Sequence, residues 1–141
     1  MNAETAAHLA RTVGKKASFA YLNGDSYTFE FLAPDVLLNM NDRTHWRKKA
    51  QQVKNWRTAT SYAAGQQIGI TLPPCWVHLT LPVRDSRRRD PMNYAPTLKA
   101  CVDGMVDAGL WVDDTPEYVT CVEPKLEKRT LRWVTVELVP R

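Results

Sequence analysis

The chain has 141 residues, of which 44% are hydrophobic, and a formal net charge of +4 at neutral pH. This length can bury one sizeable core, and the even spread of tryptophan, tyrosine and branched residues argues against disorder, so we predict a single folded domain. No apolar run reaches the roughly 20 residues of a membrane span, and the first residues lack the pattern of a secretory signal. We therefore expect a cytoplasmic protein with no membrane partner.

The cysteines and histidines do not have the spacing of a disulfide framework or a metal site. Three cysteines cannot all pair, and no two of them stand two to four residues apart. We expect buried free thiols that pack as small hydrophobic side chains. One histidine, His45, lies in a basic segment where it could meet a phosphate. The full set is Cys75, Cys101, Cys121, His8, His45 and His78.

The polar residues 1–16 predict an N-terminal extension, which leaves 17–141 as the domain. The pair Asn23-Gly24 suits a tight turn between two alternating strands. We therefore expect a hairpin, and its firmer half is the strand Tyr27–Ala33.

A long helix is predicted from Thr44 to Ala64, where apolar residues recur at helical spacing and Gly65 offers a stop. Its two tryptophans, Trp46 and Trp56, are expected in the core or at its boundary rather than as platforms for nucleic-acid bases. The apolar stripe consists of Trp46, Ala50, Val53, Ala59 and Ala63.

The second half of the chain predicts a strand, a helix and two more strands. Residues 76–83 alternate as a strand does, and a helix follows from about Thr97 to Ala108, with Gly109 at its end. Strands are then expected over 118–126 and 131–139. The order β-α-β-α-β-β predicts an α/β (α+β) domain with a single small mixed β-sheet and two main helices, and an extra N-terminal strand is possible.

One face of the second predicted helix is charged. Lys99, Asp103 and Asp107 stand four residues apart and therefore line the same face. For Asp107 we expect a surface ion pair. The buried side is expected to consist of Leu98, Cys101, Val102, Met105 and Val106.

Several common enzyme sites are missing from the sequence. It has no Gly-rich phosphate loop, no G-x-G-x-x-G and no convincing Ser/His/Asp set. We therefore do not favour nucleotide binding or nucleophilic hydrolysis, and we expect no nucleotide cofactor.

Two clusters of cations suit a polyanionic partner. The segment 42–57 carries six cations and one acid, and four arginines precede Asp90. Lysine and arginine displace the counterions condensed on phosphates, so clusters with tryptophan between the charges suit a nucleic acid. The alternatives are an ordinary solvated helix face and a surface that binds an acidic protein. The cations are Arg43, Arg47, Lys48, Lys49, Lys54, Arg57, Arg84, Arg87, Arg88 and Arg89.

Carboxylates flank the second predicted helix in a pattern that suits a divalent metal ion. Asp90 precedes the helix and Asp103 lies within it, while Asp113 and Asp114 follow it. Mg²⁺ and Mn²⁺ prefer hard oxygen ligands, so a site of this kind needs carboxylates that converge from different elements. The helix is about 18 Å long at 1.5 Å per residue, so the loops and the sheet must bring its two ends together.

The stretch RRRDPMNYAPTLKACVDGMVDAGLWVDD, residues 87–114, resembles the RusA-type Holliday junction resolvases, in particular their phage and prophage members. The shared pattern is an arginine-flanked aspartate, an asparagine, K-x-x-x-D on a helix, a glycine and a final D-D. The segment LNMNDRTHWRKKAQQVKNWR resembles the basic entry into the family's first helix, and the last two strands also fit. The resemblance covers about Tyr27 to Val139. Its pattern falls here on Arg89, Asp90, Asn93, Lys99, Asp103, Gly109, Asp113 and Asp114.

The resemblance implies a RusA-like nuclease domain that cleaves DNA phosphodiester bonds at four-way junctions, in recombination, repair or phage DNA processing. It also implies Mg²⁺ as cofactor with Mn²⁺ as a substitute, a homodimer that makes paired symmetric nicks, and a bacterial or phage-infected host cytoplasm. The implied catalytic residues are Asp90, Asp114, Lys99 and Asp103, and the implied metal ligands are Asp90, Asp114, Asp113 and Asn93. The implied contacts to branched DNA are Arg87, Arg88, Arg89, Arg43, Arg47, Lys48, Lys49, Lys54, Arg57 and Asn41.

One position departs from the family pattern. Better-known members have a second aspartate two residues after the first, where this chain has Met92, and a few additional residues stand before Lys99. Asn93 offers a neutral oxygen near that position, so one negative charge fewer would face the metal. The alternative function is a catalytically weakened or inactive protein of the same fold that binds branched DNA.

Overall fold

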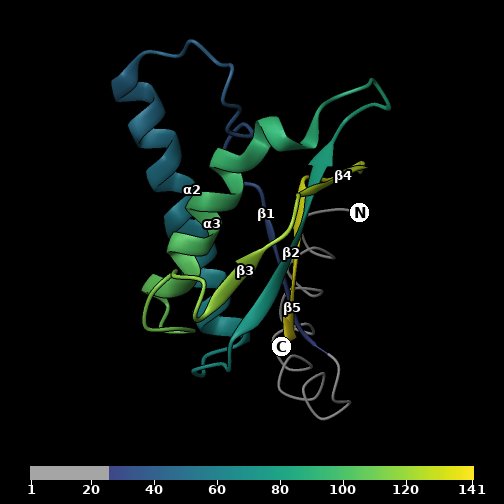
Figure 1. Cartoon of the computed structure of the whole chain (residues 1–141). Helices are drawn as coiled ribbons and strands as arrows, with labels where there is room; N and C mark the ends of the chain where they lie inside the picture. The colour runs from purple at the N-terminus through teal and green to yellow at the C-terminus, as the bar shows by residue number, and fades with distance from the viewer. Residues whose placement is uncertain (1–25) are drawn as a thin grey trace.

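The computed structural model describes residues 26–141, so the predicted extension at 1–16 and the predicted turn at Asn23-Gly24 lie outside the described residues. The described part is a small α+β domain with one mixed sheet and two main helices, which confirms the predicted fold class (Figure 1). Neither of these helices is long and apolar enough to cross a membrane. The elements are β1 (Tyr27–Leu32), α2 (Trp46–Gln67), β2 (Cys75–Val83), the 3-10 helix η2 (Pro91–Tyr94), α3 (Ala95–Asp107), β3 (Val119–Cys121), β4 (Lys125–Lys128) and β5 (Trp133–Pro140).

The sheet has the strand order β1-β5-β2-β3, and β4 also pairs with β2. Strand β5 runs antiparallel to β1 and β2, whereas β3 and β4 run parallel to β2. Parallel neighbours need a crossover connection, which α3 supplies between β2 and β3. Both helices lie on the same face of the sheet (Figure 1), and the hydrophobic core lies between these two layers.

The strand predicted after the second helix is divided in two. Cys121 pairs with Val77 and Lys125 pairs with Thr80, so three residues of this segment stand opposite two residues of β2. One of the three is Pro124, which has no N–H to donate to the sheet. The strand is interrupted at this extra residue and continues as β4 beside the end of β2.

The alternation predicted for β2 is confirmed. Trp76 and His78 are exposed, whereas Val77, Leu79 and Leu81 are buried in the core. Successive side chains of a strand point to opposite faces, so the buried set faces the helices. The buried face of β5 consists of Val134, Val136 and Leu138.

The two tryptophans of α2 have different environments. Trp56 is fully buried, and its ring meets that of Phe31 edge-on with 6.2 Å between the centroids. Trp46 is 68% exposed, so the prediction that it packs in or beside the core is wrong. It is the first residue of α2 and precedes the buried part of the helix, and its ring contacts His45 and the Arg47 guanidinium instead.

Polar side chains occupy part of the buried face of α2. Gln67 accepts a hydrogen bond from the Glu30 N–H at 3.1 Å and donates one to the Glu30 carbonyl at 2.6 Å. Thr60 is also buried, and its hydroxyl donates to a carbonyl of its own helix. These bonds satisfy polar groups that would be costly to bury alone. The predicted apolar stripe is therefore only partly right, since Ala63 is buried but Ala50 is exposed.

Two of the three predicted thiol environments are confirmed. Cys75 and Cys101 are buried, and burial raises the pKa of Cys75 to about 11, which keeps this thiol protonated and unreactive at neutral pH. Cys121 is exposed near the edge of the sheet, so the prediction of burial is wrong for this residue.

Glycines with positive φ stand just beyond both helix ends. Helix α2 continues past the predicted stop at Gly65 and ends at Gln67, two residues before Gly69, which has a φ of 68°. Helix α3 ends at Asp107, and Gly109, with a φ of 85°, turns the chain as predicted. Residues with side chains rarely adopt such angles, which explains glycine at these two positions.

Helices α2 and α3 are in close contact at Gly104. A Cβ atom added there would lie 2.5 Å from the Arg57 carbonyl oxygen and 2.9 Å from the Thr60 Cβ, so only a hydrogen atom fits between the helices. At the surface, the Arg57 guanidinium donates to both carboxylate oxygens of Asp107, at 2.5 Å and 2.8 Å. The surface ion pair predicted for Asp107 is thus confirmed, with its partner on the other helix.

Gly104→Ala is expected to destabilise the domain by about 1–3 kcal/mol, because the added methyl group would force the two helices apart. The matched control is Gly65→Ala in α2, where a Cβ would meet nothing within 4 Å. This second change should stabilise the domain by roughly 0.5–1 kcal/mol, since alanine is the better helix former. Urea unfolding measures both effects, and shifts of the same sign would contradict the close contact at Gly104.

Candidate functional site

Lys99, in the first half of α3, joins two carboxylates that come from different elements. Its Nζ donates a hydrogen bond to Oδ1 of Asp103 at 2.9 Å and another to Oδ2 of Asp114. Asp103 lies about one turn further along α3, whereas Asp114 lies in the loop between α3 and β3. This loop therefore folds back along the helix and brings three of the predicted catalytic residues together. We call them the Lys99 cluster.

The contacts in the Lys99 cluster hold both Lys99 and Asp114 in their charged forms. The hydrogen bonds that Lys99 donates to Asp103 and Asp114 raise the pKa of its ammonium group. The same ammonium lowers the pKa of Asp114, and the contact with Asp113 lowers it further. The Asp114 N–H also donates to Oδ1 of Asp113 at 2.7 Å. Lys99 is therefore a cation at neutral pH and cannot accept a proton there.

Asp90 and Asn93 lie where the chain enters α3. Asp90 caps η2, because its Oδ1 accepts a hydrogen bond from the Met92 N–H at 3.0 Å and its carbonyl accepts one from the Asn93 N–H at 3.1 Å. The ion pairs of Lys99 are with the two other aspartates and do not include Asp90. The predicted catalytic and metal-binding residues thus fall into two groups. One lies at the start of η2, and the other lies along α3 and in the loop that follows it.

Within residues 26–141, no three His, Cys, Asp or Glu side chains are grouped so that they could hold a metal ion. The Lys99 cluster supplies two carboxylates, Asp103 and Asp114, that already meet at one cation. Mg²⁺ is commonly bound by one or two carboxylates together with water and phosphate oxygens. The donor chemistry of this pair therefore fits Mg²⁺, whereas a cage of three or more protein ligands is not assembled in the described part of the chain.

The arginine-rich loop consists of residues 84–90, between β2 and η2, and its arginine side chains differ in their contacts. The Arg89 side chain is only 13% exposed, forms an ion pair with Asp85 at 2.9 Å and donates to two backbone carbonyls of the loop. Arg87 and Arg88 are exposed. Of the three loop arginines predicted to contact DNA, Arg89 therefore holds the loop backbone, while Arg87 and Arg88 are accessible to a partner.

The predicted DNA contacts of the first helix and its entry lie mostly on the surface. The Arg57 guanidinium is already paired with Asp107 across the two helices. Arg47 lies over the Trp46 ring, 5.2 Å from its centroid, and Lys49 is half-buried. The remaining exposed members are Asn41, Arg43, Lys48 and Lys54.

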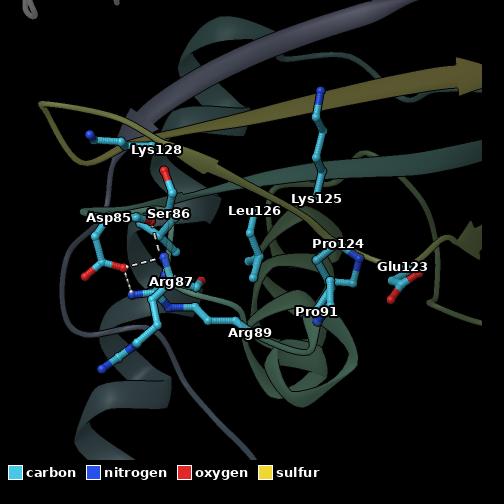
Figure 2. Close-up of a pocket in the computed structure, with 11 residues that line it drawn as sticks. Asp85, Ser86, Arg87, Arg89, Pro91, Glu123, Pro124, Lys125, Leu126 and Lys128 are labelled. Carbon is cyan, nitrogen blue, oxygen red and sulfur yellow. Dashed lines mark hydrogen bonds and ion pairs between the residues drawn. The ribbon is translucent and has the colours of Figure 1, made fainter.

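Two cations of β4 are absent from the predicted DNA contacts although they share a surface with the arginine-rich loop. A hollow of about 600 Å³ is lined by Arg87 and Arg89 together with Lys125 and Lys128 (Figure 2). The two lysines reach this position because β4 pairs with the last residues of β2, directly before the loop. In the sequence they belong to a predicted strand and bend, and no local pattern links them to the arginines.

No protein-family model matches the chain, and no curated protein matches it significantly. The resemblance to the RusA-type resolvases therefore depends on the residues quoted from the sequence.

Lys99→Met is expected to raise the pKa of Asp114 toward the ordinary aspartate value of about 3.9, because the ammonium that lowers it is removed. A carboxyl-carbon NMR titration measures the change. The folded pKa of Asp114 lies below its unfolded value, so its contribution to stability is present above a pH of about 4 and is lost as the pH falls through the folded pKa. Lys54→Met, on the exposed surface of α2, is the control. An equal shift in both variants would contradict the direct contact with Lys99.

Proposed function

We propose that this chain is a metal-dependent endodeoxyribonuclease that resolves four-way DNA junctions by paired nicks, acting as a homodimer in the cytoplasm. The observation that carries the proposal is the Lys99 cluster, in which a lysine and an aspartate of the RusA-like pattern meet across fifteen residues of sequence. The positive surface around the arginine-rich loop supports a polyanionic substrate. The resemblance alone supplies the junction, the dimer and the cellular context.

Lys99 would act on the DNA phosphate through its charge. Its raised pKa keeps the side chain an ammonium, so it is a partner for anions and not a general base. A fixed cation beside a phosphodiester stabilises the negative charge that develops on the phosphate oxygens during cleavage. The side chain is 62% exposed, so it can turn from the carboxylates to a phosphate without disturbing the core.

Asp114 and Asp103 would hold Mg²⁺, or Mn²⁺ in its place, and the resemblance adds Asp90, Asp113 and Asn93 as further ligands. When bound, the ion would activate a water molecule and neutralise charge on the phosphate. The Asp113 carboxylate accepts a hydrogen bond from the Asp114 N–H, which fixes the orientation of the Asp113 side chain next to Asp114.

The exposed cations of α2 and of the arginine-rich loop would hold the DNA backbone. Such contacts fix the position of the DNA and do not read its sequence. Each phosphate that they neutralise releases counterions, so junction binding should weaken steeply as the salt concentration rises.

The second candidate function is binding of branched DNA without cleavage. Two observations favour it: residues 26–141 contain no group of three metal-ligating side chains, and Met92 stands where the family has an aspartate. The two functions share the same DNA contacts, so only a cleavage assay separates them.

The purified protein is expected to nick a synthetic four-way junction symmetrically in the presence of Mg²⁺ or Mn²⁺. Asp114→Asn should slow cleavage by about 100-fold or more, the scale of losing one group that stabilises the transition state. Glu117→Gln removes one negative charge from an exposed position of the same loop, outside the Lys99 cluster, and it should cleave at the wild-type rate. Gel analysis of labelled junction strands measures all three. Binding without nicks in either metal would establish the second candidate function.

Met92→Asp should lower the Mg²⁺ concentration needed for half-maximal cleavage, by about 10-fold, because it adds a carboxylate beside Asp90. Met92 is 50% exposed, so the substitution leaves the core intact. Met92→Asn has nearly the same shape without the charge and is the control. Calorimetric titration with Mn²⁺ gives a second readout, and equal metal affinities in both variants would argue against a ligand role for this position.

A further inference from the structure

A second hollow, of about 480 Å³, shares Arg87 and Arg89 with the hollow in Figure 2. It lies where the arginine-rich loop meets the segment that follows β1 and the turn between β4 and β5. Five arginines line it, against a single acidic residue, Asp42. We call this site the arginine hollow, and the five are Arg84, Arg87, Arg89, Arg129 and Arg132.

Hydrogen bonds fix the arginines that come from the β4–β5 turn. Arg129 donates to a backbone carbonyl at 3.0 Å and to the Thr135 hydroxyl at 2.8 Å, and its side chain is only 19% exposed. Arg132 donates to the Asp35 backbone carbonyl. Carbonyl and hydroxyl oxygens are uncharged, so these bonds position the guanidinium groups without cancelling their charge.

Acidic residues around the arginine hollow balance only part of its charge. Asp85 pairs with Arg89 at 2.9 Å, and Glu127 lies 3.6 Å from Arg129. Arg84 and Arg87 are exposed, and their side chains form no hydrogen bond or ion pair with any residue in 26–141. These two side chains therefore remain as donors for a ligand.

Like charges gathered in one hollow repel each other, so the ligand that best relieves them is an anion. Guanidinium groups match phosphate in particular, because each can donate two parallel hydrogen bonds to it. The positive surface also continues past Arg87 into the hollow of Figure 2, where Lys125 and Lys128 extend it. Two adjoining hollows exceed what one phosphate occupies and suit successive phosphates of a chain.

We infer that the arginine hollow binds the phosphodiester backbone of a nucleic-acid strand, with Arg84 and Arg87 as phosphate contacts beside a wall of fixed arginines. The inference rests on the proposed function for the identity of the strand as DNA. It adds the β4–β5 turn, with Arg129 and Arg132, to the surface that holds this strand. Free phosphate presents the same oxygens, so the experiment separates the two sources.

The test compares three single-charge variants of the same loop, Arg84→Gln, Arg87→Gln and Arg88→Gln. Arg88 is also exposed and belongs to the loop cations proposed to hold the DNA backbone, but it lines neither hollow, so it is the comparison for a loop arginine outside the arginine hollow. Fluorescence anisotropy measures binding to a labelled junction and a labelled duplex over a range of salt concentrations. Arg84→Gln and Arg87→Gln should each weaken binding about fivefold or more and reduce the salt slope by about 1, against about twofold or less for Arg88→Gln.

Equal losses in all three variants would mean that the loop acts only through its net charge, and would overturn the arginine hollow as a site. Calorimetry with inorganic phosphate covers the other source. Saturable phosphate binding that disappears in Arg84→Gln, with DNA binding intact, would assign the hollow to free phosphate. In a competition experiment, polyglutamate and unlabelled DNA are each used to displace labelled DNA. If polyglutamate is as effective as unlabelled DNA, the arginine hollow would be assigned to an acidic protein instead.

Failure of this inference and failure of the proposed function give different results. A protein that never nicks junctions but loses DNA binding in Arg84→Gln and Arg87→Gln would lack the nuclease activity and keep the DNA-binding hollow. A protein that nicks junctions normally, with equal losses in the three loop variants, would keep the activity and lack the hollow.

Discussion

The contact between α2 and α3 at Gly104 determines where the candidate functional groups stand. Because only a hydrogen atom fits between the helices there, α3 cannot rotate about its axis without separating them. In this fixed orientation of α3, Lys99 faces outward and Thr97 faces inward. The Thr97 hydroxyl accepts a hydrogen bond from the Leu38 N–H at 2.7 Å and donates one to the Leu38 carbonyl at 2.9 Å. The segment after β1, which forms one side of the arginine hollow, is thereby tied to the start of α3. One helix contact thus positions both the Lys99 cluster and a wall of the hollow.

The charged groups around α3 differ in how completely they are balanced. Arg57 and Asp107 cancel each other, and an exposed pair of this kind is worth about 1 kcal/mol or less, so it orients the helices more than it stabilises them. The Lys99 cluster has two carboxylates for one ammonium and keeps a negative charge. The arginine hollow keeps a positive one. Unbalanced sites of opposite sign, one along α3 and one at the loop that leads toward it, are what a ligand made of a divalent cation and a polyanion would require.

Sequence patterns predict well the contacts that depend on residues close together in the chain. They predict poorly the contacts that depend on how strands pair in the sheet. The pairing of Lys99 with Asp103 follows from helical spacing alone, and the predicted alternation of β2 also needs only adjacent residues. Trp46 and Trp56 belong to the same predicted helix, however, and only the position of the helix over the sheet covers one of them and leaves the other exposed. Arg129 was outside every predicted site, because the strand pairing that brings its turn beside the arginine-rich loop joins segments far apart in the chain. The candidate site was therefore predictable along α3 and unpredictable across the sheet.

Competition for the two carboxylates would link the proposed metal ion to DNA. The Lys99 ammonium already stands where Asp103 and Asp114 meet, and a divalent cation at that point would be repelled by it. The carboxylates would therefore bind Mg²⁺ well only after Lys99 has turned to another anion, and a DNA phosphate is such an anion. Binding of either ligand would then raise the affinity for the other by the same factor. This reciprocity would offset the carboxylate that is missing at Met92, because the phosphate itself supplies oxygen ligands to Mg²⁺.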